Sequence, residues 1–159
     1  MSNILILGSG SRESVLVWKL KKSKNLTNIY VSPGNGGTHE HNVSLNFEDI
    51  PNFVNENNID YVIPGSETYL VKGITDILEK NTHTCVVGPD FDGARLETSK
   101  SFAKSFMKEN NIPTADYETF NDINTAKMHV ENELPPFVIK ANGLAGGKGV
   151  TIANTKKEA

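Results

Sequence analysis

Four short apolar segments alternate with helical patterns over the first 87 residues, and this alternation leaves few possible folds. The segments are predicted to be strands, at residues 3–7, 28–32, 60–63 and 84–87. Apolar residues between them recur at helical spacing, most regularly over residues 70–78. Strands that alternate with helices through short loops form a parallel sheet with right-handed crossovers. We therefore predict an α/β fold built on a Rossmann-like parallel sheet.

Glycine-bearing loops follow three of the predicted strands, over residues 8–13, 33–38 and 64–67. The carboxyl ends of parallel strands share one edge of the sheet, and ligands bind at that edge. The three loops are therefore predicted to line one binding site in the N-terminal domain.

The first of these loops differs from a dinucleotide-binding loop. Gly8 and Gly10 fit a Gly-x-Gly pattern, but Glu13 stands where a third Gly or Ala is expected. No acidic residue closes the second strand to bind a ribose, so NAD binding is disfavoured. Arg12 beside a helix N-terminus suits a phosphate monoester. A surface ion pair between Arg12 and a carboxylate is an equally simple interpretation.

A second glycine cluster lies near the C-terminus, between two apolar segments within residues 136–152. The first segment reads as a buried strand ending in Lys140, and the loop after it holds four glycines and Lys148. Glycines allow unusual backbone angles, and free N–H groups in such a loop form a concave anion site. We predict a phosphate cradle whose ligand is a nucleotide triphosphate.

Two other interpretations of this loop are a Walker loop and a flexible hairpin. In a Walker loop, Gly143 and Gly147 would be one residue further apart, and Ser or Thr would follow Lys148 where Gly149 stands. A P-loop NTPase is therefore disfavoured. A flexible hairpin with solvated lysines is the structural alternative, although seven residues are long for a tight hairpin turn.

A helix is predicted from Ser99 to Asn110, with Lys100 in its first turn. A cation at this end of a helix is unfavourable with respect to the helix dipole. This placement hints at a ligand role for Lys100, and a solvated surface lysine is the alternative.

The domain boundary is expected in residues 111–114, where Pro113 interrupts the pattern. We expect an N-terminal domain over residues 1–110 and an incomplete second domain over residues 111–159. In the second domain a strand is predicted over residues 116–120, followed by a helix and the glycine-rich segment.

The composition indicates a globular protein. Of the 159 residues, 37% are hydrophobic and 22% are charged, and the net charge of −3 argues against a dedicated nucleic-acid binder. Apolar runs are too short for a signal or membrane segment, so we expect a cytoplasmic protein without nucleic-acid or membrane partners. Cys85, Trp18 and the phenylalanines are predicted to be buried. His39 and His41 lack further ligands at suitable spacing, so no metal site is predicted.

Six segments, taken in order, resemble the glycinamide ribonucleotide synthetases, or phosphoribosylamine–glycine ligases, of the ATP-grasp superfamily. They are GSGSRE (8–13), PGNGGT (33–38), GSE (65–67) with LVKG (70–73), LETSK (96–100), NIPTA (111–115) and VIKANGLAGGKGV (138–150). Each is a weak signal alone, but six in the family's order are specific and cover nearly the whole chain. The resemblance implies a Rossmann-like, pre-ATP-grasp domain followed by the first part of an ATP-grasp α+β domain.

The resemblance also implies a reaction of purine biosynthesis. The family joins glycine to 5-phosphoribosylamine while ATP becomes ADP and phosphate, and glycine is activated as an acyl phosphate. ATP and Mg²⁺ are the expected cofactors, with the metal ligands expected beyond residue 159. No catalytic residue is assigned.

The family pattern implies roles for individual residues. Lys100 and Lys140 contact the ATP phosphates, and residues 143–149 form a mobile lid over them. The ATP-binding residues implied are Lys100, Lys140, Gly143, Gly146, Gly147, Lys148 and Gly149. The phosphoribosylamine-binding residues implied are Gly8, Gly10, Arg12, Glu13, Asn35, Gly36, Gly65 and Glu67.

Three residues depart from the family pattern. Ser14 stands in place of His, Ser66 in place of Pro, and Asn142 in place of Asp. The change at Asn142 removes a carboxylate beside the triphosphate site.

The sequence stops at Ala159, and we expect an N-terminal portion of the ligase that is inactive alone. The alternative is a non-catalytic module that binds phosphate sugars or nucleotides.

Overall fold

The computed structural model describes residues 1–159 and divides them into two compact units, Met1–Ala94 and Arg95–Ala159. The division lies earlier than the boundary expected after residue 110. Helix α6 (Lys100–Glu109) belongs to the second unit, because hydrogen bonds join its first turn to residues 142–143.

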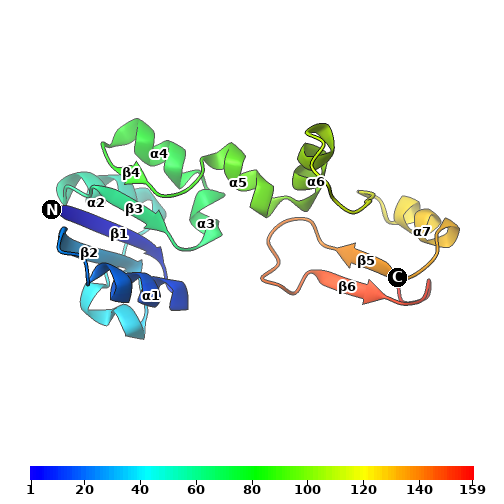
Figure 1. Cartoon of the computed structure of the whole chain (residues 1–159), viewed down its shortest axis with the longest axis horizontal. Coiled ribbons are helices and arrows are strands. Elements are labelled where there is room, and N and C mark those ends of the chain that lie inside the picture. Colours follow the sequence, from blue (N-terminus) through cyan, green and yellow to red (C-terminus); the bar gives the residue numbers. More distant parts are fainter. The chain divides into compact units, whose positions relative to one another are not determined.

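The first unit is built on a parallel sheet with strand order β2-β1-β3-β4 (Figure 1). The strands are β1 (Ser2–Gly8), β2 (Leu26–Pro33), β3 (Tyr61–Pro64) and β4 (Cys85–Val86). In the register, Leu5 of β1 lies opposite Tyr30 of β2 and Val62 of β3. All three strand pairs are parallel, which confirms the predicted α/β fold.

Seven short helical elements belong to or begin in this unit. They are α1 (Ser11–Leu20), η1 (Gly36–His41), η2 (Phe47–Asp49), α2 (Ile50–Glu56), α3 (Glu67–Leu70), α4 (Ile74–Asn81) and α5 (Phe91–Thr98). The apolar stripe over residues 70–78 falls on two helices, because Gly73 between them has φ +73°. Glycine adopts this left-handed conformation without the strain that a side chain imposes. The sequence did not predict α5.

The core lies on both faces of the sheet. On one face, Leu5 and Leu7 of β1 pack in a buried cluster with residues of α2 and α4 such as Ile50 and Leu78. On the other face, Ile4 and Ile6 pack in a cluster with Val17 of α1. Alternate side chains of β1 are therefore buried on opposite sides, which explains its continuous apolar run.

The second unit contains two helices and a hairpin besides the end of α5. Helix α6 is followed by α7 (Ile123–Asn132), and strands β5 (Phe137–Lys140) and β6 (Val150–Ala153) pair antiparallel. The strand predicted over residues 116–120 is wrong, since that segment has no regular structure. A strand needs a partner for its backbone N–H and C=O groups, and here β5 and β6 pair with each other alone.

Several predictions of burial are also wrong. Trp18 is 60% exposed on α1, where Lys22 Nζ lies 3.4 Å from its ring centroid. Cys85 is exposed on the edge strand β4. Phe91, Phe106 and Phe120 are also exposed, whereas Phe47 and Phe53 pack partly buried against the core, as predicted. Strand β5 is not covered on both faces, because Val138 is 57% exposed in the two-stranded sheet. Apolar character alone did not show which faces find a packing partner.

Candidate functional site

The three glycine-bearing loops meet at the carboxyl edge of the sheet, as predicted. Strand β1 lies between β2 and β3, and Gly8 is in register with Pro33. The ladder extends into the loops, since Gly34 N donates to Gly8 O at 3.0 Å and Gly65 N donates to Leu7 O at 2.8 Å. The loop backbones are therefore held side by side.

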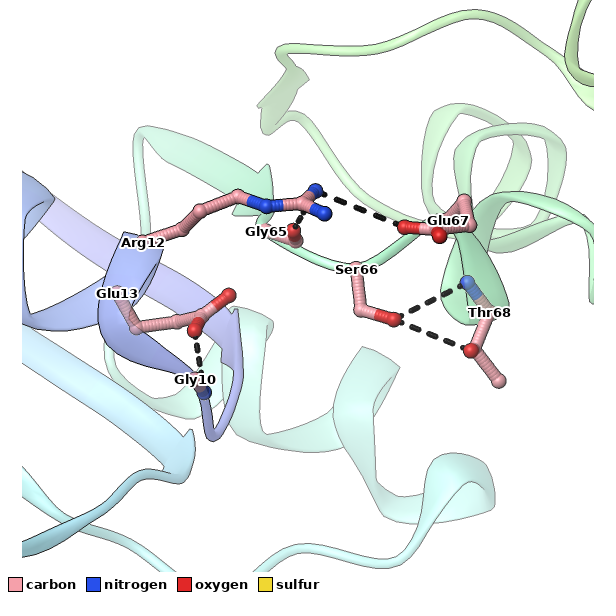
Figure 2. Close-up of polar contacts among 7 residues, drawn as sticks. All are labelled: Gly10, Arg12, Glu13, Gly65, Ser66, Glu67 and Thr68. Carbon is pink, nitrogen blue, oxygen red and sulfur yellow. Dashed lines mark hydrogen bonds and ion pairs between the residues drawn. The ribbon is translucent and has the colours of Figure 1, made fainter. Parts of the chain in front are cut away.

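The carboxylate of Glu13 fills the space between the first and third loops. Glu13 is 2% exposed, and its Oε2 accepts a hydrogen bond from Gly10 N at 2.5 Å (Figure 2). A β-carbon at Gly8 or Gly65 would collide with Glu13 Oε1. These two glycines therefore make room for a buried carboxylate of the protein. The substrate-binding role that the family resemblance implies for Gly8 and Gly65 stays a prediction.

Arg12 lies across the edge of the same site. Its Nη1 donates to the Gly65 carbonyl oxygen at 3.0 Å and lies 3.6 Å from Glu67 Oε2 (Figure 2). The Arg12 side chain remains 72% exposed and that of Glu67 37%. A guanidinium carries five N–H donors, so this arrangement anchors Arg12 while leaving donors available to an anion. Both sequence interpretations of Arg12 are compatible with it.

Asn35 ties the second loop to the first. Its Oδ1 accepts from Gly37 N at 2.7 Å, and its Nδ2 donates to Gly10 O at 2.7 Å. Ser14 Oγ also donates to Asn35 Oδ1, at 3.0 Å. The Asn35 amide is thus engaged within the protein, whereas a β-carbon at neighbouring Gly36 would meet nothing within 4 Å. Sequence reasoning noted Ser14 as a departure from the family but missed its place in this network.

Tyr69 on α3 adds a polar group that sequence reasoning missed. Its hydroxyl donates to the carbonyl oxygen of buried Ser32 at 3.5 Å. Burial, and to a lesser extent the negative charge of Glu13, raises the pKa of Tyr69 above its ordinary value. Tyr69 therefore remains a neutral hydroxyl at physiological pH. No pattern in the sequence pointed to Tyr69, because it lies beside an otherwise apolar helical stripe.

Lys100 and the glycine-rich loop are brought together within the second unit. Lys100 Nζ donates to Gly143 O at 2.7 Å, and Asn142 Oδ1 accepts from Ser101 N at 3.2 Å. The side chains of Lys140 and Lys148 are exposed. The first turn of α6 is therefore bonded to the start of the loop.

The backbone of this loop requires glycine at three positions. Gly143, Gly146 and Gly147 have φ of +87°, +55° and +76°, and a β-carbon at any of them would meet nothing within 4 Å. Their need for glycine is thus conformational and not a matter of crowding. Such a loop presents backbone N–H groups to its surroundings, as an anion site does.

A metal site is not found among the side chains of residues 1–159. No group of three or more His, Cys, Asp or Glu residues is placed to hold a metal ion. We therefore assign no Mg²⁺ ligand to these residues.

None of the helices has the length and apolar character that crossing a bilayer requires.

The sequence matches two models of one protein family in succession. Residues 2–97 match the N domain of phosphoribosylglycinamide synthetase, and residues 98–159 match its ATP-grasp (A) domain. The phosphoribosylamine–glycine ligase of Mesorhizobium japonicum is 46% identical over 162 residues, covering 99% of this chain and 38% of the relative.

Solved structures agree with the family match. Phosphoribosylamine–glycine ligase from Thermotoga maritima has a TM-score of 0.81 at 33% identity, over 98% of this chain and 37% of that chain. N5-carboxyaminoimidazole synthase from Aspergillus clavatus shares the fold, with a TM-score of 0.72 at 15% identity over 99% of this chain and 42% of that chain. That enzyme was solved in complex with ADP and 5-aminoimidazole ribonucleotide.

The chain spans less than half the length of each of these proteins. The resemblance predicted from the six sequence segments is nevertheless confirmed, since the N-domain model alone matches residues 2–97 of 159. This chain belongs to the phosphoribosylglycinamide synthetase family.

Proposed function

We propose that the chain serves in a phosphoribosylamine–glycine ligase, which joins glycine to 5-phosphoribosylamine at the expense of ATP. The observation that carries this proposal is the unbroken succession of the family's N domain and ATP-grasp domain over residues 2–159. A cytoplasmic location, without nucleic-acid or membrane partners, remains a prediction.

In the first unit, the carboxyl edge of the sheet is proposed to bind 5-phosphoribosylamine. The exposed guanidinium of Arg12 supplies charge-assisted hydrogen bonds to the phosphate. Glu67 can accept hydrogen bonds from sugar hydroxyls or the amine, and the space beside Gly36 admits a ligand. Glu13 and Asn35 then act as internal supports of the loops, since their polar atoms bind Gly10.

In the second unit, the glycine-rich loop is proposed to bind the ATP phosphates. Lys100 already contacts the first loop residue, Lys140 precedes the loop, and Lys148 lies within it. Cations and backbone N–H groups stabilise the charge that spreads over a transferring phosphoryl group. The hydrogen bond from Lys100 to Gly143 must be shared or exchanged when Lys100 meets a phosphate.

The proposed reaction has two steps. A glycine carboxylate oxygen first takes the γ-phosphoryl group, and ADP leaves. The amine nitrogen of 5-phosphoribosylamine then bonds to the glycine carbonyl carbon and loses a proton, and phosphate leaves as its bond to that carbon breaks. When bound, Mg²⁺ neutralises charge on the phosphate oxygens. Residues of this chain bind and orient two of the three substrates in this scheme.

A non-catalytic module for phosphate sugars or nucleotides is the second candidate. Its support is the exposed guanidinium of Arg12, which can bind a phosphate whether or not a reaction follows. Under both candidates the chain binds ribose 5-phosphate, a stable analogue of the substrate, and ATP. Calorimetric titration with each ligand tests this, and a chain that binds neither ligand would refute both candidates.

A turnover assay separates the two candidates. The chain is incubated with ATP, Mg²⁺, glycine and freshly generated 5-phosphoribosylamine, and ADP and glycinamide ribonucleotide are measured. We expect binding without turnover, because an ATP-dependent ligase needs bound metal and a site closed to water. Turnover of about 1 s⁻¹ or faster would show that the chain holds the catalytic groups itself.

A further inference from the structure

The side chain of Asn142 caps a helix that begins far from it in the sequence. Its Oδ1 accepts from Ser101 N at 3.2 Å, across 41 positions, and Ser99 Oγ lies 3.5 Å away as a second donor. The first N–H groups of a helix have no partner inside the helix. An acceptor oxygen at this place therefore stabilises the first turn of α6.

The cap from Asn142 adds to a local one. Ser99 is the N-cap residue of α6, and its Oγ accepts from Phe102 N at 3.2 Å. A local cap of this kind is sufficient to start a helix. The bond from Ser101 to Asn142 does something that the local cap cannot do, because it also fixes where the first turn lies relative to the loop.

The residues next to this bond make a second, parallel one. Lys100 precedes Ser101, Gly143 follows Asn142, and Lys100 Nζ donates to Gly143 O at 2.7 Å. The helix dipole disfavours a cation in the first turn, so Lys100 is held there by specific contacts and not by intrinsic preference. Two hydrogen bonds, from Ser101 to Asn142 and from Lys100 to Gly143, thus define the position of the Lys100 ammonium group.

We propose that Asn142 is a positioning residue, which through its cap on α6 holds Lys100 at the first residue of the glycine-rich loop. The inference rests on the proposed function, in which Lys100 contacts the ATP phosphates. Without the bond from Ser101 to Asn142, the first turn of α6 is no longer fixed relative to the loop, and the Lys100 side chain samples many positions. Ordering Lys100 again on binding costs conformational entropy, so ATP binds more weakly.

The experiment is calorimetric titration of the full chain with ATP. Asn142→Ala should bind ATP about fivefold to tenfold more weakly, and Asn142→Asp, which keeps the acceptor oxygen, should stay within about twofold of the unsubstituted chain. Asn110→Ala is the matched control, because Asn110 Nδ2 donates to Phe106 O at 2.8 Å at the other end of α6. If Asn142 merely stabilised the helix, Asn110→Ala would weaken ATP binding equally.

A double-mutant cycle with Lys100→Met decides whether Asn142 acts through Lys100. In the Lys100→Met background, Asn142→Ala should have no further effect on ATP affinity. Equal effects in both backgrounds, or no effect of Asn142→Ala in either, would overturn the proposal. Asn142→Ser, whose hydroxyl is too short to reach the same place, replaces Asn142→Ala if the latter does not fold.

Hydrogen exchange separates this inference from the proposed function. The Ser101 amide should exchange faster in Asn142→Ala and remain protected in Asn110→Ala. If the unsubstituted chain does not bind ATP while this difference is found, the proposed function fails and the link between Asn142 and α6 stands. If Ser101 is equally protected in both variants, the positioning role is refuted whatever the affinity for ATP.

Discussion

The carboxylate of Glu13 occupies the space in which a side chain at Gly65 would begin. Glu13 is on α1 and Gly65 follows β3, so this contact joins the first turn of α1 to a loop that is far from it in the sequence. The same carboxylate accepts a hydrogen bond from Gly10 N. The shape of the sheet edge therefore depends on a buried acid as much as on the glycines around it.

The first prediction concerns this contact. Gly65→Ala should lower the free energy of unfolding by about 1–3 kcal/mol, because the new methyl group overlaps the Glu13 carboxylate. Gly36→Ala is the matched control and should change stability by less than about 0.5 kcal/mol, since nothing lies within 4 Å of its β-carbon. Urea unfolding measures both.

Shortening Glu13 provides the complementary test of the same contact. Glu13→Ala should be destabilising alone, because it leaves Gly10 N without its acceptor. Combined with Gly65→Ala, its effect should be less than the sum of the two single changes. Strict additivity would mean that the two residues do not interact.

The second prediction concerns Arg12. Arg12→Ala should weaken the binding of ribose 5-phosphate by about 1.5–3 kcal/mol, the usual loss for a charge-assisted hydrogen bond. Arg12→Lys should restore part of the affinity, because it keeps the charge but not the planar fork. Lys19→Ala, an exposed lysine further along α1, is the control for general charge. Calorimetry that gave equal affinities for Arg12→Ala and the unsubstituted chain would remove Arg12 from the site.

The third prediction concerns the alkaline titration of Tyr69. Burial and the charge of Glu13 raise the pKa of Tyr69, so its phenolate should form above the ordinary pH of about 10. The ultraviolet absorbance of tyrosinate, compared between the unsubstituted chain and Tyr69→Phe, isolates this titration. Glu13→Gln should lower the midpoint only in part, because burial is the larger cause.

The sign of the effect on stability follows from the same shift. Because the folded state holds the Tyr69 proton more tightly, its contribution to stability is complete below the unfolded pKa of about 10. It is lost as the pH rises through the folded pKa. Tyr69→Phe should therefore lose less stability than the unsubstituted chain over this range. A Tyr69 midpoint at or below about 10 would contradict the prediction.

The fourth prediction concerns the loop over residues 143–149. Without nucleotide its amides should exchange faster than those of β5 and β6, because it lies outside the strand ladder. Lys100→Met should increase this exchange near Gly143 by removing the bond to its carbonyl oxygen. Lys104→Met is the control, since Lys104 Nζ bonds to Thr114 and Ala115 instead. A loop as protected as the strands would not be a mobile lid.

The sequence by itself determined the sheet and the position of its loops. The runs around Leu5, Val31 and Val62 are apolar because their strands lie in the core, and the helical stripes between them are local patterns. Short connections between such elements permit parallel pairing only, so the three loops had to share one edge. The glycine-rich loop after Lys140 could also be predicted from the sequence, because each left-handed backbone conformation in it requires a glycine at that position.

The tertiary structure alone decided what each of these residues contacts. Trp18 and Cys85 are as apolar as core residues, but their side chains are exposed in the fold. The need for glycine at position 65 comes from Glu13, and the role of Asn142 comes from Ser101, more than 40 positions away. Periodicity and propensity describe neighbours along the chain. Burial, collision and capping by distant side chains depend on neighbours in space, which only folding brings together.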